Sequence, residues 1–265
     1  MKNQPTILQK IFEQKKIRVE EARQGFEYDE FVNRAKKFRQ DEIPNRFAKA
    51  FADDTAINII AEIKRASPSK GIINENFDAG EVATNYEKFG AKAISVLTEE
   101  DFFKGKIEDL MTARNLTDLP ILRKDFVFDE FQVYEAALIG ADAILLIAAM
   151  LEDEDLQKLF ALAAELGLDV LVEIHNLEEL VRAIQIGAKI IGINNRNLHT
   201  FEVSLDTSRN LIENAPDEAI KICESGLSQK QELIEMKNLG FNGFLIGESL
   251  MKSQKVQQKL KSFIE

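Results

Sequence analysis

Several apolar segments of the sequence end in charged or amide side chains whose types suit acid–base chemistry. The segment INIIAEIKR carries Glu62 and Lys64 two residues apart, and PILRKDF carries Lys124 and Phe126 in the same relation. Residues two apart on a β-strand point to the same face of the sheet. Further polar residues stand at the ends of three more β-rich segments: Glu173, Asn194, Arg196 and Glu224.

Two lysines, one arginine and three glutamates in this set would form a catalytic pocket if the fold brings them together. Burying several charges without partners is costly. In a crowded and partly desolvated site the pKa values of such groups shift, which gives acid and base forms near neutral pH. Taken one at a time, each residue also fits a solvated strand end, and Glu62 with Lys64 also fits a structural ion pair.

The last two β-rich segments end in small residues, Ser225-Gly226 and Gly247-Glu248-Ser249. Glycine lets backbone N–H groups approach phosphate oxygens, so these turns predict a phosphate site. Glu248 is awkward beside a dianion, and we expect its side chain to point away while its backbone amide binds. The alternative is that the glycines merely turn the chain.

The two histidines and the single cysteine are interpreted as structural. His175 shares the face of Glu173 but falls where the strand gives way to polar sequence, and His199 stands in a polar loop. Cys223 fits a small buried strand residue and excludes an internal disulfide. No cluster has metal-ligand spacing and no nucleotide-binding glycine motif follows a strand, so neither a metal nor a nucleotide is expected.

A repeated sequence pattern predicts the helices and strands that must position these residues. Five times a helical pattern ends in an apolar residue and a glycine, at Gly90, Gly140, Gly167, Gly187 and Gly240, and a nearly continuous apolar run follows. The chain contains eight such strand candidates, centred on Ile60, Val96, Leu122, Leu146, Val172, Ile193, Cys223 and Leu245.

The spacing between these centres is that of one βα unit each time. Eight units predict an α/β fold of a single (β/α)₈ TIM barrel, with an open doubly wound sheet as the rival. In a barrel of this kind the carboxyl ends of the strands face the active site.

The first fifty residues have a different character. They are charged and helical in pattern, and no strand precedes Ile57. We therefore expect an N-terminal helical extension over 1–52 packed on a catalytic barrel over 53–265. The extension is either a solvated cap or a cover for the active site.

The composition narrows the class of partner. The chain has 265 residues, and 34 basic against 45 acidic residues give a net charge of −11. Nucleic acid and anionic membranes need a basic field and are not expected, whereas a small anion can still be held locally. The longest apolar run, from Ala143 to Leu151, is nine residues, against about 20 for a membrane span. The charged start of the chain lacks a signal-type apolar stretch, so we expect a cytoplasmic protein.

The quoted segments resemble, in order, those of the indole-3-glycerol phosphate synthase family. The matching segments are IIAEIKRASPSKG, LTEEDFFKG, PILRKDF, GADAILLI, LVEIH, IIGINNRNLHTF, ESGLS and LIGESLM, and they span Ile59 to Met251. The first and third are highly specific, whereas GADAILLI could occur in many barrels. The helical extension also fits the family.

The resemblance implies a substrate, a reaction and a set of residue roles. The substrate would be 1-(2-carboxyphenylamino)-1-deoxyribulose 5-phosphate, a small phosphorylated anthranilate derivative, which closes to indole-3-glycerol phosphate with loss of carbon dioxide and water and without a cofactor. Lys124 would be the general acid and Glu173 the general base. Lys64 would hold anionic groups of the substrate and share the acid role, with Glu62 orienting it.

The remaining roles are implied in the same way. Asn194 and Arg196 would position the anthranilate portion, and Ser67 and Glu224 belong to the pocket. An apolar wall around the ring would consist of Phe103, Phe126, Leu145 and Leu198. The phosphate would bind to Ser225, Gly226, Gly247 and Glu248.

Other functions compete with this one. A phosphoribosylanthranilate isomerase-like barrel would not need both lysine segments, and a Schiff-base aldolase would use Lys124 or Lys64 as a nucleophile. A non-catalytic barrel scaffold gains nothing from a charged pocket. The sequence is compatible with a monomer or a homodimer.

Overall fold

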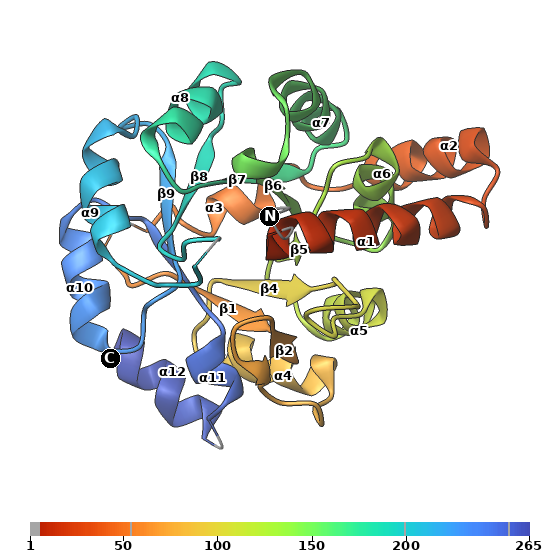
Figure 1. Cartoon of the computed structure of the whole chain (residues 1–265). Helices are drawn as coiled ribbons and strands as arrows, with labels where there is room; N and C mark the ends of the chain where they lie inside the picture. The colour runs from red at the N-terminus through yellow and green to blue at the C-terminus, as the bar shows by residue number, and fades with distance from the viewer. Residues whose placement is uncertain (1–5, 54, 199, 254) are drawn as a thin grey trace, which may run out of the picture.

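Eight parallel strands close into a barrel in the computed structural model, which describes residues 6–53, 55–198, 200–253 and 255–265 (Figure 1). The strands are β1 (Ile59–Ile63), β4 (Ala93–Leu97), β5 (Ile121–Lys124), β6 (Ala143–Ile147), β7 (Asp169–Ile174), β8 (Ile190–Asn194), β9 (Ile220–Glu224) and β10 (Gly243–Ile246). β1 pairs with both β4 and β10, which closes the ring. The predicted TIM barrel is confirmed, every predicted strand centre lies in a strand, and the open sheet is wrong.

Helices follow the strands and cover the outside of the barrel. They are α4 (Ala79–Lys88), α5 (Ile107–Leu116), α6 (Glu130–Leu138), α7 (Asp153–Glu165), α8 (Leu177–Gln185), α9 (Asp206–Leu211), α10 (Lys230–Asn238), α11 (Glu248–Met251) and α12 (Val256–Ile264), with 3₁₀ turns η1 (Ala148–Met150) and η2 (Ile212–Asn214). The glycines predicted to end helices all have positive φ, which is the left-handed conformation of a helix C-cap. A small hairpin, β2 (Ala66–Ser67) with β3 (Gly71–Ile72), follows β1.

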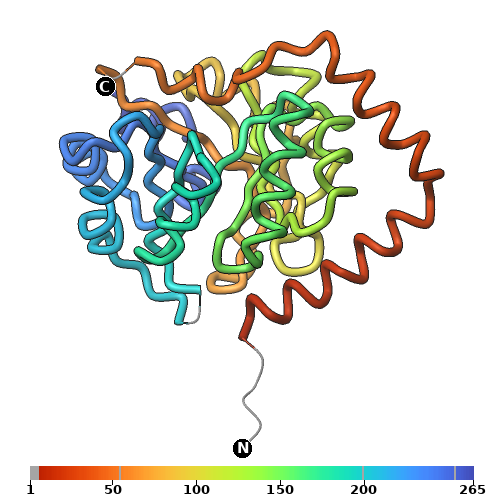
Figure 2. The backbone as a smooth tube through the Cα atoms, turned by 90° about the horizontal axis from the view of Figure 1, so that it is seen from above, coloured from red at the N-terminus to blue at the C-terminus, as the bar shows by residue number. Residues whose placement is uncertain are grey.

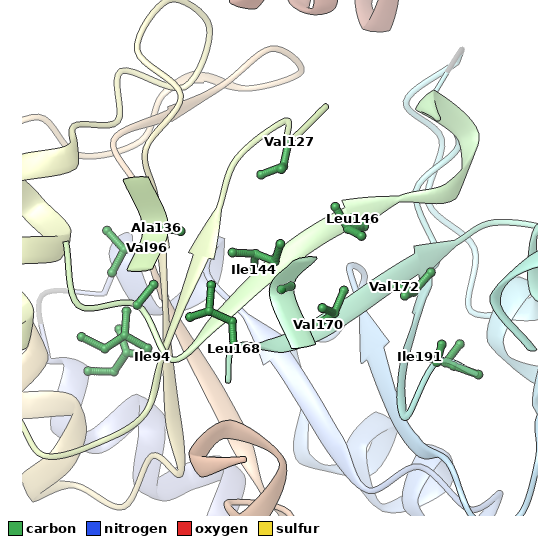
Figure 3. Close-up of a cluster of buried hydrophobic side chains, with 14 of the residues drawn as sticks. Ile94, Val96, Val127, Ala136, Ile144, Leu146, Leu168, Val170, Val172 and Ile191 are labelled. Atoms are coloured by element: carbon green, nitrogen blue, oxygen red, sulfur yellow. The ribbon is translucent and has the colours of Figure 1, made fainter. Parts of the chain in front are cut away.

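The strand residues divide into two apolar clusters because successive side chains point to opposite faces. One cluster lies between strands and helices, where Ile94, Val96, Ile144 and Leu146 pack with neighbours such as Ala136 of α6 (Figure 3). The other fills the inside of the barrel and contains alternate residues of the same strands: Ile60, Leu122, Leu145, Leu171, Ile190, Ile222 and Leu245. Polar residues that share this inward alternation therefore face the barrel interior.

Within the described part of the chain before β1, the helices are α1 (Ile7–Arg23), α2 (Tyr28–Arg39) and α3 (Arg46–Lys49). When the molecule is turned by 90° from the view of Figure 1, α1 and α2 are seen to wrap around one side of it (Figure 2). Arg39 is buried and donates to the carbonyl oxygens of Leu166 and Gly167, each at 2.9 Å. This side chain attaches α2 to the end of α7.

The segment around α3 closes the amino-terminal end of the barrel. Phe47 and Phe51 are buried in the inner apolar cluster. The backbone N–H of Ala48 donates to Asp169 Oδ2 at 3.0 Å, at the first residue of β7. The extension thus reaches the end of the barrel opposite to the carboxyl ends of the strands.

The helix α1 docks at that carboxyl end through charged side chains. Lys15 is buried, and its Nζ lies 2.9 Å from Asp125 Oδ2 and 3.2 Å from Glu100 Oε2. Arg18 pairs with Asp101 at 2.8 Å. Among the helices of the described residues, none is both long and apolar enough to cross a bilayer.

Candidate active site

A cavity of about 790 Å³ opens at the carboxyl ends of the strands. All the site residues predicted from the sequence line it. Ile7, Leu8 and Ile11 of α1 contribute to the lining as well, so the first helix supplies part of the cavity wall.

Lys124 occupies the centre of the charged part of the cavity. Its Nζ lies 3.3 Å from Glu173 Oε2 and 3.6 Å from Glu224 Oε2, so β5, β7 and β9 each supply one group. Burial alone would lower the pKa of the Lys124 ammonium, but the surrounding carboxylates, Glu173 above all, raise it above its ordinary value. Lys124 is therefore a cation at neutral pH.

The pKa values of the two carboxyl groups beside Lys124 are shifted in opposite directions. Burial would raise the pKa of Glu173, but Lys124 and then His175 outweigh it and hold that pKa far below its usual range. Burial and the charge of Glu173 raise the pKa of Glu224, although Lys124 opposes the shift. Lys124 and His175 therefore favour the ionised form of Glu173, whereas burial and the charge of Glu173 favour the neutral form of Glu224.

Two glycines make room for the carboxylates inside the barrel. A Cβ at Gly192 would stand 2.1 Å from Glu224 Oε1, and a Cβ at Gly247 would stand 2.3 Å from Glu62 Oε1. Neither side chain could keep its place beside a larger residue at these positions. Glu62 of β1 and Lys64, directly after this strand, pair through Oε1 and Nζ at 2.7 Å, which confirms that the two side chains share a face.

An apolar wall faces the charged groups. The rings of Phe103 and Phe126 lie with centroids 5.9 Å apart at an interplanar angle of 42°. Leu145 of β6 and Leu198 of the loop after β8 pack in the same inner cluster. This wall suits a flat aromatic ligand.

Arg196 is held by loops on two sides of the cavity. Its Nη1 donates to the carbonyl oxygen of Phe201 at 3.2 Å and to Ser69 Oγ at 3.4 Å. Asn194 Oδ1 accepts from the backbone N–H of Arg196 at 3.0 Å. Ser67 lies in the two-residue strand β2, which pairs with β3.

The small-residue turns after β9 and β10 form the opposite rim. Ser225 and Gly226 both have positive φ, at 64° and 83°, and such consecutive backbone N–H groups can form an anion cradle. Glu248 pairs with Lys252 at 2.7 Å. The hydroxyl of Ser249 is buried without a hydrogen-bond partner among the described residues.

Several residues at the site were not predicted from the sequence. Lys70 and Lys252 add cations to the lining, and the spacing of Lys252 four residues after Glu248 on a helix was the available signal. Asp125 directly follows β5, continues its outward alternation and binds Lys15. His175, interpreted as structural, has its Nε2 3.4 Å from Glu173 Oε1, and its shared alternation with Glu173 was the missed sign.

The cysteine, the second histidine and a cluster of three acidic residues have no assigned part in the site. Cys223 is buried in β9, as predicted, and burial raises the pKa of its thiol to about 11. His199 lies outside the described residues. The carboxylates of Glu99, Glu100 and Asp101 lie close together, but backbone N–H groups, Lys15 and Arg18 respectively engage them.

Comparisons with known proteins agree with this geometry. The family model described as indole-3-glycerol phosphate synthase matches residues 8–263. The proteins of that name from Lachnoclostridium phytofermentans and Campylobacter jejuni (strain 81-176) are 48% and 46% identical to the chain. The first alignment covers 87% of this chain and 82% of the relative, and the second covers 97% and 100%.

Solved structures of low identity share the fold alone. The 3-hexulose-6-phosphate synthase of Salmonella typhimurium superposes with a TM-score of 0.64 at 12% identity, over 78% of this chain and 96% of that one. A mutant tryptophan synthase α-subunit of Pyrococcus furiosus gives 0.61 at 14% identity, over 78% and 98%. With the family model matched along nearly the whole barrel and its extension, the chain belongs to the indole-3-glycerol phosphate synthase family, carboxy-lyases of tryptophan biosynthesis that act on a phosphorylated anthranilate derivative.

Proposed function

We propose that Lys124 is the general acid and Glu173 the general base of the family reaction in this chain. The reaction closes the indole ring of 1-(2-carboxyphenylamino)-1-deoxyribulose 5-phosphate with loss of carbon dioxide and water. One observation carries the proposal: an ammonium and an ionised carboxylate lie 3.3 Å apart within the cavity. A protonated lysine can donate a proton and an ionised carboxylate can accept one, as a general acid and a general base must.

The acid acts at the substrate's ketone. The ring carbon that bears the carboxylate attacks the ketone carbon, a carbon–carbon bond forms, and Lys124 protonates the ketone oxygen to a hydroxyl group. Carbon dioxide then leaves, and its bonding electrons restore the aromatic ring. The raised pKa of Lys124 supports this role over that of a Schiff-base nucleophile, which must be a neutral amine.

The base acts in the dehydration. The new hydroxyl group leaves as water with a proton from Lys64, and Glu173 takes a proton from the methylene carbon bonded to the nitrogen, which forms the last double bond of the indole. Lys64 neutralises substrate anions and shares the acid role, while Glu62 orients it through the 2.7 Å ion pair. Glu224, in its protonated form, fills the space beside Gly192 and lets Glu173 alone carry the negative charge.

The rest of the cavity binds the substrate. The wall formed by Phe103, Phe126, Leu145 and Leu198 takes the anthranilate ring, which Asn194 and Arg196 position, with Ser67 at the edge. The phosphate binds to backbone N–H groups around Ser225, Gly226, Gly247 and Glu248. The unpaired hydroxyl of Ser249 supports an anion at this rim.

The wider organisation follows from the same site. We divide the chain into an extension over 1–52 and a catalytic barrel over 53–265, and the lining of the cavity by α1 supports a shared function for the two parts. A monomer or homodimer is sufficient because the acid, the base and the apolar wall come from one chain. The buried free thiol of Cys223 suits the reducing cytoplasm.

Two substitutions test the roles. Lys124→Ala and Glu173→Gln should each lower kcat by about 10²–10⁴, the range for removal of an acid or base, with the formation of indole followed by fluorescence in buffer treated with a chelator. Lys158→Ala is the matched control, since this lysine is 63% exposed and pairs with Glu130 outside the cavity. Near-normal turnover of both active-site variants would refute the roles of Lys124 and Glu173, whereas the assignment of the chain to its family would still hold.

A further inference from the structure

We propose that His175 is a positioning residue for Glu173, and that Glu179 fixes the imidazole in place. The proposal deepens the function proposed above, because it rests on Glu173 acting as the base. His175 directly follows β7 and has the same inward alternation as Glu173, two residues earlier.

Glu179 holds the imidazole ring from the far side. His175 Nδ1 lies 3.0 Å from Glu179 Oε2, and the backbone N–H of His175 donates to the same oxygen at 2.7 Å. The other oxygen, Glu179 Oε1, accepts from Asn176 Nδ2 at 2.6 Å. Since Asn176 also caps the start of α8 by accepting from the backbone N–H of Glu179, the helix terminus fixes the orientation of the ring.

The second ring nitrogen points at the base. His175 Nε2 lies 3.4 Å from Glu173 Oε1, and this buried atom has no hydrogen bond among the described residues. The other oxygen of the same carboxylate, Glu173 Oε2, faces Lys124 at 3.3 Å. Each oxygen of Glu173 therefore faces a different nitrogen, and each nitrogen comes from a different element.

The ring carries a positive charge at neutral pH. Burial would lower the pKa of His175, but Glu173 and Glu179 together raise it to about 9. These two carboxylates, on β7 and α8, are the charged groups that face the ring among the described residues, and Lys124 and Glu224 lie beyond Glu173.

The arrangement has a consequence for the catalytic cycle. When Lys124 gives its proton to the substrate, its ammonium charge no longer stabilises Glu173. His175 is then the neighbouring cation that still faces the carboxylate, so it keeps Glu173 ionised and oriented until the dehydration step. A histidine that only capped α8 would have no such effect on the base.

The pH dependence of the kinetics separates these two roles. Loss of the imidazolium raises the pKa of Glu173, so the acidic limb of kcat/KM should move to higher pH in both His175→Ala and His175→Gln. Gln retains a donor near the position of Nε2, and it should preserve more of kcat than Ala. We expect kcat of His175→Ala to fall by roughly 10- to 100-fold, the range for coupled residues in one network, with KM changed less than kcat.

A double substitution shows whether His175 acts through Glu173. If it does, adding His175→Ala to Glu173→Gln should lower kcat little further, because the carboxylate is already absent. Independent losses that multiply would overturn the proposal. An unchanged kcat and pH profile in both His175 variants, with Glu173→Gln impaired, would overturn it and leave the base intact, whereas normal turnover of Glu173→Gln would refute the base itself.

A spectroscopic measurement does not depend on activity. The chain has two histidines, so comparison with His199→Gln identifies the ring signals of His175 in NMR spectra. The wild-type imidazole should titrate near pH 9, and Glu179→Gln should bring that midpoint down toward the ordinary value of about 6.5. An ordinary midpoint in the wild type would overturn the proposal even if the His175 variants failed to fold.

Discussion

The ion pair between the extension and the barrel offers a quantitative test of how α1 is held at the active site. Lys15 is 3% exposed, and its Nζ lies 2.9 Å from Asp125 Oδ2. Asp125 stands between Lys124 and the substrate-facing Phe126, so the contact joins α1 to the strand end that carries the proposed acid. We predict that Lys15→Met destabilises the protein and weakens substrate binding.

The expected loss of stability depends on the partners that Asp125 keeps when Lys15 is replaced. Breaking a buried ion pair costs about 3–5 kcal/mol when the remaining charge is left uncompensated. Here Arg123 stays 3.1 Å from Asp125 Oδ2 and the hydroxyl of Thr98 donates to the same oxygen at 2.6 Å. We therefore expect a smaller loss of about 2–3 kcal/mol, which is roughly 30- to 150-fold in the folding equilibrium.

Undocking of α1 limits the loss, because a detached helix lets water reach Asp125. The assay is urea unfolding combined with limited trypsin digestion, which reports detachment before global unfolding. Since Ile7, Leu8 and Ile11 line the cavity, KM should rise with detachment. Lys16→Ala is the control, because Lys16 is 47% exposed and its ion pair with Glu13 lies within α1.

The pH dependence adds a second measurement. Burial would raise the pKa of Asp125, but Lys15 and Arg123 lower it from 3.8 to about 2. A depressed carboxyl pKa contributes stability that is present above about pH 4 and is lost as the pH falls toward 2. Lys15→Met should weaken this acid dependence. If Lys15→Met proves as stable as Lys16→Ala and as resistant to trypsin, the reasoning is wrong.

Two further predictions concern the interior of the barrel. Gly247→Ala should displace Glu62 from Lys64, because the new Cβ would stand 2.3 Å from Glu62 Oε1. Overpacking of this kind costs about 1–3 kcal/mol, and a loss of about 1.4 kcal/mol from substrate binding would raise KM about tenfold. The circular dichroism spectrum should be unchanged, and a normal KM would contradict this. Glu224→Gln should lower kcat by less than about tenfold near pH 6.5, because the raised pKa already makes Glu224 neutral. Glu173→Gln should lower kcat by about 10²–10⁴. Equal losses of kcat in a side-by-side fluorescence assay would refute the assigned protonation states.

Local patterns were sufficient to predict the architecture. The glycines that end helices and the apolar runs that follow them, as at Gly140 before β6, depend on conformational preferences of a few neighbouring residues. The alternation of side chains along a strand likewise places Glu62 with Lys64 on one face before any tertiary contact is known. Placement of the strand-end residues around one cavity then followed from the closed barrel.

The chemistry within that cavity depends on distances that no local pattern contains. Lys124, Glu173 and Glu224 lie far apart in the sequence, and the closed barrel brings the Lys124 ammonium within 3.3 Å of Glu173 and 3.6 Å of Glu224. Desolvation there decides which carboxyl group keeps its proton, and a pKa responds to surroundings from every side.

The same reason explains what the sequence did not reveal. The positive charge of His175 depends on how burial and the carboxylates of Glu173 and Glu179 balance in the folded chain. Lys15 contacts Asp125, which is 110 residues away in the sequence. Residue types and spacings specify which side chains share a face. The protonation state and the role of each side chain depend on long-range packing, because electrostatic energies in a buried site are set by charges that the folded chain brings from distant segments.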